Sequence, residues 1–328
     1  MLIPPKYTFS PEISQLLSRI EASKAVIDAI KIPIEVEQNI RRKSTLRSAL
    51  FSARIEGSDL TLDTFDASSN KKKAEVYNIL KATEWLYSQH SKDIHTIQLQ
   101  QLHKTALHGL IDKSQLGNFR AEVSAIFNSA GIAIYMPPPP SHIRPLVDRL
   151  IKYAQSPKEP FIPIRASLAH YIFEKIHPFM DGNGRVGRLL LQKILAQYGY
   201  GMKGLLSIEE YLDNHRSSYY RALEEPEKEL SDYIVFMLTA IADTAEKAQA
   251  LVSQKQQNDG TDFLLPRRAE IYTIIKEQRL VNFDMIRRRF LAVNERTLRF
   301  DLKQLQDAGL IRKRGTTKGV YYEAIKSV

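Results

Sequence analysis

Twelve consecutive residues bring together a histidine, a carboxylate, several glycines and two arginines. Residues 177–188 read HPFMDGNGRVGR, and they lie between two segments with helical spacing of apolar residues, 165–176 and 186–198. Because Pro178 and the glycines interrupt the first helix, we expect DGNG to be a tight loop that leads into the second helix. Backbone N–H groups at a helix start favour an anion, and glycine lets a phosphate approach closely. The pattern therefore predicts a phosphate-binding loop.

Four side chains around this loop have complementary chemistry. Arg185 and Arg188 are three residues apart in the opening turn of the second helix, so both can bind phosphate oxygens. Asp181 offers a hard oxygen ligand that suits Mg²⁺. His177 can remove a proton from an incoming hydroxyl near neutral pH. Each residue alone is explained by a cap, a turn or a solvated face, but their coincidence favours a functional site.

The segment resembles the signature of the Fic family, His-Pro-Phe-x-(Asp/Glu)-Gly-Asn-(Gly/Lys)-Arg-x-x-Arg, and matches it at every defined position. The resemblance implies that His177 is the general base and that Asp181 holds Mg²⁺ as the cofactor. It further implies that a Ser, Thr or Tyr hydroxyl of a target protein attacks the α-phosphorus of ATP, and that pyrophosphate leaves. The ATP-binding residues that it implies are Asp181, Gly182, Asn183, Gly184, Arg185, Val186, Gly187 and Arg188.

Two other segments resemble the family outside the signature. Residues 117–120 (GNFR) followed by 131–140 (GIAIYMPPPP) resemble the loop and β-hairpin flap that hold the backbone of the target. The flap residues that this implies are Ile132, Ala133, Ile134 and Tyr135. Tyr219 and Tyr220 match a Tyr-Tyr pair that lines the nucleotide site in similar proteins, and a core stripe is the alternative interpretation.

A further motif lies nearer the N-terminus. Residues 52–57 read SARIEG and match the inhibitory pattern (Ser/Thr)-x-x-x-Glu-(Gly/Asn) of similar proteins. The resemblance implies Ser52 and Glu56 as inhibitory residues and predicts that Glu56 pairs with Arg188. A carboxylate in the fork of that arginine competes with phosphate for the same charge-assisted hydrogen bonds. Two alternatives stay open: Glu56 simply ends a helix at Gly57, or it also supports removal of AMP.

The bulk composition sets limits on compartment and metal chemistry. The chain has 328 residues, 43% of them hydrophobic, and no cysteine, so disulfides and thiolate metal sites are excluded. The N-terminus lacks the features of a signal peptide, and no apolar run approaches the roughly 18 residues of a membrane helix. We therefore expect a soluble, cytoplasmic protein with no membrane contact. The formal net charge of +10 lies mostly in residues 266–328, where 15 Lys and Arg accompany 7 Asp and Glu.

The patterns together predict a mainly α fold, a Fic helical bundle with a small β-hairpin flap, plus a C-terminal winged helix-turn-helix (α+β) domain. Helical spacing of apolar residues recurs in 74–88, 95–108, 143–155, 165–176, 186–198 and 231–252. The expected regions are an N-terminal helical region with the inhibitory motif (1–90), a Fic catalytic domain (91–252), a linker (253–265) and a winged-helix-like domain (266–328).

The basic C-terminal segment leaves its partner open. Helical patterns in 269–278, 283–290 and 294–308 precede a strand pair, an order that resembles a winged helix. The basic residues that would neutralise DNA phosphates are Arg296, Arg299, Lys303, Lys313, Arg314 and Lys318. Winged helices also dock proteins and form dimers, so DNA, another protein and a second copy of the chain are all candidate partners.

Two functions follow from the sequence. The first is a protein adenylyltransferase (AMPylation) that transfers AMP from ATP to an unidentified target protein, with the chain itself as a candidate, and that is autoinhibited by Glu56 pairing with Arg188. The alternative is a nucleotide-sensing DNA-binding transcriptional regulator with a catalytically silent Fic domain. The intact His177 favours the enzyme, because a sensor needs the loop and the arginines but no base.

Overall fold

The computed structural model describes residues 1–30, 34–65, 67–88, 94–127, 133–257, 266–278, 280–291, 293–315 and 319–325. Helices dominate the chain, which confirms the prediction of a mainly α-helical fold. The chain divides into two compact units, residues 1–29 with 40–249 and residues 30–39 with 250–328. Most of the linker expected at 253–265 lies outside the described residues. None of the described helices combines the length and apolar character needed to cross a membrane.

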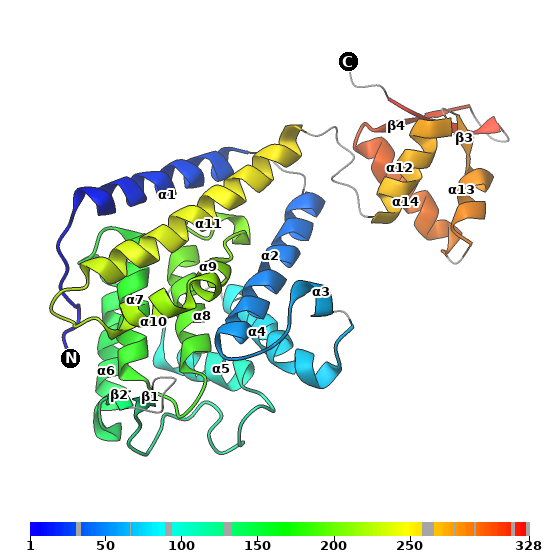
Figure 1. Ribbon diagram of the computed structural model, residues 1–328. Coiled ribbons are helices and arrows are strands. Elements are labelled where there is room, and N and C mark those ends of the chain that lie inside the picture. Colours follow the sequence, from blue (N-terminus) through cyan, green and yellow to red (C-terminus); the bar gives the residue numbers. More distant parts are fainter. Residues whose placement is uncertain are drawn as a thin grey trace. The chain divides into compact units, whose positions relative to one another are not determined.

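From the N-terminus to residue 257 the chain forms helices and one two-stranded sheet (Figure 1). In order these are α1 (Pro11–Ala29), α2 (Ile34–Ile55), α3 (Leu62–Phe65), α4 (Asn70–Ser88), α5 (Thr96–Ala106), β1 (Ile126–Phe127), β2 (Ala133–Tyr135), α6 (Pro140–Ala154), α7 (Ile162–Ile176), α8 (Asn183–Gln197), the 3-10 turn η1 (Met202–Gly204), α9 (Ile208–Asn214), α10 (Arg216–Glu224) and α11 (Ser231–Gln257). The first unit contains all of them except the first residues of α2 and the last residues of α11.

Helices α7 and α8 form the centre of the first unit (Figure 1). Every residue of α7 from Pro163 to Phe173 is buried, as expected of a helix that other helices cover on all sides. At the edge of the unit α1 lies along α11, where Arg19 reaches Asp243 and Glu246 with N–O distances of 2.8 Å each. The loop between α7 and α8 is therefore anchored at both ends by core helices.

Left-handed residues set the two ends of this loop. His177 ends α7 with φ 47°, and its N–H donates to the carbonyl of Phe173 at 3.0 Å. This conformation costs a non-glycine residue about 1 kcal/mol. Gly182 precedes α8 with φ 78°, and a Cβ at this position would lie 2.5 Å from Cδ2 of Leu107. Glycine is therefore required here by both the backbone angle and the close approach of α5's C-terminal end.

The short hairpin expected near residue 135 is present. Strand β2 pairs antiparallel with β1, with Ile126 opposite Tyr135 and Phe127 opposite Ala133. The prolines that follow lead into α6, whose first residue, Pro140, needs no hydrogen-bonded N–H at a helix start.

Besides the ends of α2 and α11, the described part of the second unit contains three complete helices and a small antiparallel sheet. Its elements are α12 (Pro266–Gln278), β3 (Val281–Asn282), α13 (Phe283–Arg289), α14 (Glu295–Asp307), β4 (Ile311–Arg314) and β5 (Tyr321–Ala324). The strand order in the sheet is β3-β5-β4. Asparagine caps begin two of the helices: Oδ1 of Asn282 accepts from the N–H of Met285 at 2.9 Å, and Oδ1 of Asn294 from that of Arg296 at 2.8 Å.

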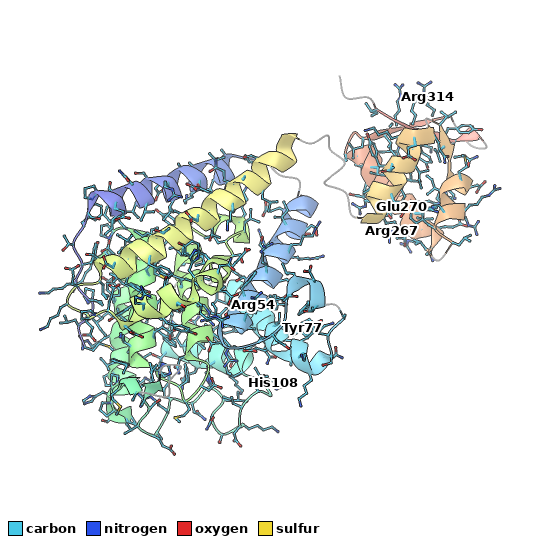
Figure 2. The ribbon with its side chains drawn as sticks, viewed as in Figure 1. Arg54, Tyr77, His108, Arg267, Glu270 and Arg314 are labelled. Carbon is cyan, nitrogen blue, oxygen red and sulfur yellow. The ribbon has the colours of Figure 1, made fainter. Side chains whose placement is uncertain are left out.

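A small core holds this unit together. Its fully buried apolar residues include Ile271, Ile275, Ile286, Leu298, Leu302, Leu305 and Ile311. Asp301, 1% exposed, accepts from Arg267 at 2.6 Å and from Arg268 at 2.9 Å, so the buried carboxylate is paired on both oxygens. Figure 2 labels Arg267 on α12 and Arg314 on β4. The winged-helix interpretation of this unit stays a prediction.

Candidate active site

Asn183 braces the loop between α7 and α8. Its Nδ2 donates to the carbonyl of Phe179 at 2.8 Å, and its Oδ1 accepts from the N–H of the same residue at 2.9 Å. Asn183 is 2% exposed and Phe179 is fully buried, so both hydrogen bonds are shielded from water. The loop is thus ordered by its own side chains, with no ligand needed to shape it.

His103 of α5 supports the loop from behind, and nothing in the sequence marked it. Its ring stacks on Phe179 with centroids 3.9 Å apart. Its Nδ1 accepts from the N–H of Gly117 at 2.9 Å, so the ring proton lies on Nε2, which donates to the carbonyl of Asp181 at 3.0 Å. Burial lowers the pKa of His103 to about 4, so the imidazole is neutral near pH 7. It ties the loop at residue 117 to the loop between α7 and α8.

His177 lies at the entrance of the loop with its side chain half-buried. Its Nδ1 lies 3.4 Å from the carbonyl of Glu174, and burial lowers the pKa of His177 below its usual value. The imidazole is therefore neutral at neutral pH, as a general base must be. Its backbone is held by Arg120, 3% exposed, whose Nε donates to the His177 carbonyl at 2.8 Å and whose N–H donates to Pro178 at 2.9 Å.

The segment that resembles the flap is attached to the same place. Nη2 of Arg120 donates to the carbonyl of Pro138 at 2.5 Å, and the hydroxyl of Tyr135 donates to the carbonyl of Lys175 at 3.1 Å. Strand β2 therefore lies against the end of α7, two residues before His177. Ala133 is exposed in this strand and Ile134 follows it, whereas the expected flap residue Ile132 lies outside the described residues.

Arg188 is occupied by two residues of the motif at 52–57. Its Nη2 donates to Oε1 of Glu56 at 2.8 Å and to the carbonyl of Ser52 at 3.0 Å, and its Nε donates to Oγ of Ser52 at 3.0 Å. Arg188 is 1% exposed. Oε1 of Glu56 lies only 2.4 Å from the place that a Cβ on Gly184 would occupy. The structure thus brings Ser52, Glu56 and Arg188 together, with the carboxylate directly against the glycine loop.

The end of α2 that carries this motif is fixed to α9 and α10. Nε of Arg54, labelled in Figure 2, lies 3.2 Å from Oδ2 of the nearly buried Asp213. Arg216 donates to the carbonyl of Arg54 at 2.6 Å and also contacts Asp213. These contacts hold the last turn of α2, and Glu56 with it, in position over the loop.

Arg185 is also held by carboxylates. Its Nη1 donates to Oε1 of Glu75 at 2.6 Å and its Nη2 to Oδ1 of Asp181 at 3.1 Å. The side chain of Arg185 is 7% exposed and that of Glu75 is 20% exposed. Burial raises the pKa of Glu75 although the Arg185 charge opposes this. Glu75 lies on α4, in the helical pattern at 74–88. No motif marked it in the sequence, so it could not be told from an ordinary surface glutamate.

Asp181 fits a cation that arrives with a nucleotide. Its side chain is 55% exposed, and its contacts with Arg185 and with the N–H of Gly182 both reach Oδ1, so Oδ2 is the oxygen that a cation would meet. The described residues contain no group of three His, Asp or Glu that could hold a metal. Mg²⁺ commonly takes one or two carboxylates and completes its shell with phosphate and water oxygens. The donor set present here fits that mode of binding.

The two tyrosines differ in their surroundings. Tyr219 is 1% exposed, and its hydroxyl lies 2.7 Å from Nε2 of His170, so its ring is part of the core. Tyr220 is 44% exposed, and its hydroxyl donates to the carbonyl of Ile55 at 3.2 Å, beside Glu56. Tyr220 is therefore the member of the pair whose ring faces solvent next to the glutamate.

A buried carboxyl group lies behind Arg188. Glu174 on α7 is 3.8 Å from Nδ1 of His170, and burial raises the pKa of Glu174 to about 8. Its Oε1 lies 2.1 Å from where a Cβ on Gly187 would stand, so glycine is needed for α8 to pass this close. Val186, the neighbouring residue of the signature, is fully buried. Glu174 is largely uncharged near pH 7.

The fold and the loop together define a helical protein with a histidine, a carboxylate and two arginines around a glycine-lined helix N-terminus. A family model described as the Fic/DOC family matches residues 85–195. Residues 85–195 of the chain therefore carry a Fic domain.

Similar proteins support this assignment. A protein named protein adenylyltransferase Fic from Drosophila willistoni is 26% identical over 246 residues, which are 70% of this chain and 46% of that protein. A probable protein adenylyltransferase from Aquifex aeolicus is 36% identical over 96 residues, 29% of this chain and 28% of that one. The chain spans about half the length of the Drosophila relatives that it matches.

Solved structures show the same fold. A Fic family protein from Desulfovibrio desulfuricans matches with a TM-score of 0.67 at 23% identity, covering 99% of both chains. Fic-1 from C. elegans matches with a TM-score of 0.60 at 19% identity, covering 75% of this chain and 73% of that one. At these identities the likeness concerns the fold.

Proposed function

We propose that the chain transfers AMP from ATP to a hydroxyl of a protein, and that Glu56 restrains this reaction. The observation that carries the proposal is the arrangement of His177, Asp181, Arg185 and Arg188 around one ordered loop at the start of α8. The names of similar proteins, which are called protein adenylyltransferases, support the same reaction class.

The start of α8 supplies the phosphate site. The N–H groups of residues 182–184 lie at a helix N-terminus, where the helix dipole favours an anion. Arg185 and Arg188 bring two guanidinium groups to the same turn, and their low exposure strengthens their attraction for phosphate. Asp181 would hold Mg²⁺, which when bound places positive charge on the phosphate oxygens.

His177 supplies the proton acceptor. In its neutral form it takes the proton of the target hydroxyl as the hydroxyl oxygen bonds to the α-phosphorus of ATP. The bond from that phosphorus to the bridging oxygen breaks, and pyrophosphate leaves with the electron pair. Strand β2 lies next to the end of α7 and has an edge to which a target backbone can pair, which would bring a hydroxyl to His177 without demanding a particular sequence.

Glu56 opposes phosphate binding by charge and by volume. It occupies Nη2 of Arg188, and it lies against the backbone of Gly184 where phosphate would approach. ATP can use Arg188 fully only after this carboxylate has moved. The Glu56–Arg188 pair is therefore proposed as the inhibitory contact.

The test is incorporation of α-labelled ATP into the chain and into lysate proteins in the presence of Mg²⁺. Glu56→Gly is expected to label strongly and the wild type weakly. Adding His177→Ala to Glu56→Gly should abolish label, whereas adding His142→Ala, which changes an exposed histidine of α6, should preserve it. If no variant labels while all bind ATP, the reaction is refuted and a nucleotide sensor becomes the better description.

The second unit supports a second candidate function, DNA binding. Arg296, Lys303 and Lys313 are exposed on α14 and β4. Other cations there are already paired: Arg299 with Glu295 at 3.8 Å and Arg314 with Glu323 at 2.8 Å. The expected wing residue Lys318 lies outside the described residues. DNA phosphates would have to replace these ion pairs. Arg296, Lys303 and Lys313 have no ion pair among the described residues, so they are the better first targets for mutation.

Fluorescence anisotropy with labelled duplex DNA tests this function in the full chain. Lys303→Glu should weaken binding and flatten its dependence on salt, because one phosphate contact is lost. Lys152→Glu, an exposed lysine of α6 in the first unit, is the matched control. Equal DNA affinity of the two variants would count against the DNA-binding role of α14.

A further inference from the structure

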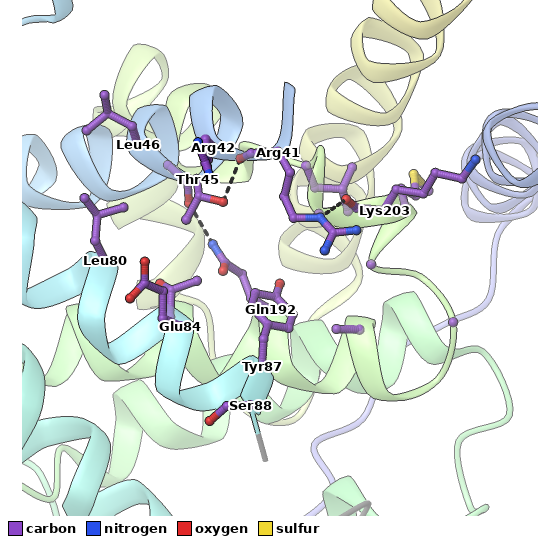
Figure 3. A pocket seen from close by; sticks show the side chains of 18 of the residues that line it. Arg41, Arg42, Thr45, Leu46, Leu80, Glu84, Tyr87, Ser88, Gln192 and Lys203 are labelled. Atoms are coloured by element: carbon purple, nitrogen blue, oxygen red, sulfur yellow. Dashed lines mark hydrogen bonds between the residues drawn. The ribbon is translucent and has the colours of Figure 1, made fainter. Parts of the chain in front are cut away.

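A cavity lies in the first unit, apart from the loop at 177–188. Its volume is about 930 Å³, within the range of small-molecule sites, and no residue of that loop is among its described lining. It is bounded by α2, α4, the second half of α8 and the turn η1. Figure 3 shows Arg42 and Thr45 of α2 on one side and Leu80 and Tyr87 of α4 on the other, with Gln192 of α8 between them.

A buried polar network forms one wall of the cavity. Oγ of Ser48 donates to Oε2 of Glu209 at 2.7 Å, and Nε2 of Gln192 donates to Oγ of Ser48 at 2.8 Å. Ser48 is 7% exposed and Glu209 is 2% exposed. Because the amide nitrogen of Gln192 is used in this network, its carbonyl oxygen is the group that it can offer to a ligand. The wall can therefore accept a hydrogen bond.

Aromatic rings and charges line the remainder. Tyr77 and Tyr87 are 43% and 47% exposed, so both rings have surface free for stacking. Within the part of the chain that the structure describes, the Arg42 guanidinium has no hydrogen bond or ion pair. Of the two carboxylates in the lining, Asp28 is paired with Lys24 at 2.8 Å, and Glu84 lies on the α4 side. The lining suits an aromatic anion that also carries a hydrogen-bond donor.

The turn η1 closes one end with an unusual backbone. Met202 and Lys203 have φ angles of 43° and 56°, and the other non-glycine residue with positive φ in the described chain is His177. Such conformations collect at ligand sites, where surrounding contacts hold them. Nε of Arg41 donates to the carbonyl of Lys203 at 2.9 Å, and a Cβ on Gly204 would lie 3.0 Å from Cγ of Arg41. The turn is thus shaped to receive a residue of α2.

The helices that form this cavity also bear the residues that hold Arg185 and Arg188. Ser52 lies in α2, one turn or about 6 Å along the helix from Ser48, and Glu56 directly follows the last residue of α2. Glu75, the partner of Arg185, lies on α4, and both arginines lie on α8. A ligand between these helices therefore contacts the elements that hold Glu56 in place.

We propose that this cavity is a regulatory site for a small aromatic anion, and that its occupation stabilises the position of α2 in which Glu56 holds Arg188. The anionic group pairs with Arg42, the ring packs on Tyr77 and Tyr87, and the donor reaches Gln192 or Glu84. Because α2 forms a wall of the site, the ligand binds this conformation more tightly than one with α2 displaced. The regulatory consequence rests on the proposed function, whereas the binding site does not.

The binding test uses 8-anilinonaphthalene-1-sulfonate, a fluorescent probe with aromatic rings, a sulfonate and an N–H donor. Arg42→Glu is expected to weaken its binding to the full chain about tenfold, as for a lost charge-assisted hydrogen bond. Thr45→Phe, which fills the cavity, should weaken it as well. Lys43→Glu makes the same change of charge at an exposed neighbour on α2 outside the lining, and should leave the affinity unchanged.

If the folded wild type, Arg42→Glu and Thr45→Phe bind the probe with equal affinity, the proposed binding site is refuted. Displacement of the probe by ATP in all three proteins would refute it as well. Hydrogen exchange tests the coupling: the probe should slow exchange of the amides at 41–56 in the wild type and not in Arg42→Glu, and unchanged exchange would refute it. If no AMP transfer is found with any variant, the proposed function fails, while the binding and exchange results still decide this inference.

Discussion

Exchanging Glu56 for glutamine or for glycine separates the two ways in which this side chain can keep phosphate from Arg188. Glutamine keeps the length of the side chain and removes its charge, so the space over Gly184 stays filled. Glycine removes both. In either variant Arg188 retains its hydrogen bonds to Oγ and to the carbonyl of Ser52, each at 3.0 Å, so the guanidinium stays in position.

The size of the effect follows from the contact. A hydrogen bond between charged groups contributes about 1.5–3 kcal/mol. The Glu56 side chain is 26% exposed, so water weakens its interaction and the lower end of this range, about 1.5 kcal/mol, applies. Since about 1.4 kcal/mol corresponds to a factor of ten, Glu56→Gln should raise the transfer rate at limiting ATP about tenfold. Glu56→Gly should exceed this, because it also clears the approach to Gly184.

The assay is the initial rate of labelled AMP incorporation over a range of ATP concentrations. Glu12→Gln, at an exposed position in the first turn of α1, controls for the loss of one negative charge. A folded Glu56→Gln variant with the KM for ATP and the rate of the wild type would refute the electrostatic part of the reasoning. Equal rates for Glu56→Gln and Glu56→Gly would refute the steric part.

Three other perturbations test neighbouring contacts. Glu75→Gln leaves the nearly buried Arg185 without its closest carboxylate, so calorimetry should show a Tm lower by roughly 2–10 °C, from about 1–3 kcal/mol of lost stability. In the Glu56→Gly background the rate should fall at acid pH as His177 takes up a proton, with its half-maximum below pH 6.5, because burial lowers the pKa of His177 from 6.5; a half-maximum above that value would contradict this assignment. Glu174 keeps its proton up to about pH 8 in the folded chain against an ordinary pKa of 4.5, so the folded state binds more protons and stability should fall as pH rises through this window. Glu174→Gln should reduce that fall, measured as the difference in Tm between about pH 6 and about pH 9; an undiminished difference would remove Glu174 as its cause.

The loop between α7 and α8 could be predicted from the sequence because its geometry is local. Pro178, Gly182 and Gly184 permit few backbone paths, and the helical patterns on either side fix where the loop begins and ends. The same reasoning predicted a hairpin near residue 135 but did not locate the second strand. That strand, β1, is two residues long and has no periodicity to detect.

The supporting contacts could not be predicted, since they join helices that are distant in sequence. Helical periodicity shows which face of α4 is buried, but not that Glu75 at its edge meets Arg185. His103 fits an ordinary amphipathic pattern, and its role depends on Gly117 approaching its ring. Tyr219 shows the same limit for a residue that a motif did mark. The sequence around it would look the same whether the ring faced a nucleotide or, as here, packed in the core with its hydroxyl on His170.

The reciprocal hydrogen bonds between Asn183 and Phe179 bear on the timing of nucleotide entry. A loop that is already ordered loses little conformational freedom when phosphate arrives, so loop closure should not limit association. If Glu56 restrains the site as proposed, the slow event is its departure from Arg188, whose rate does not depend on the nucleotide concentration. Under this scheme the rate of ATP binding rises with ATP concentration and then reaches a plateau. At the plateau the rate equals the rate at which Glu56 leaves Arg188.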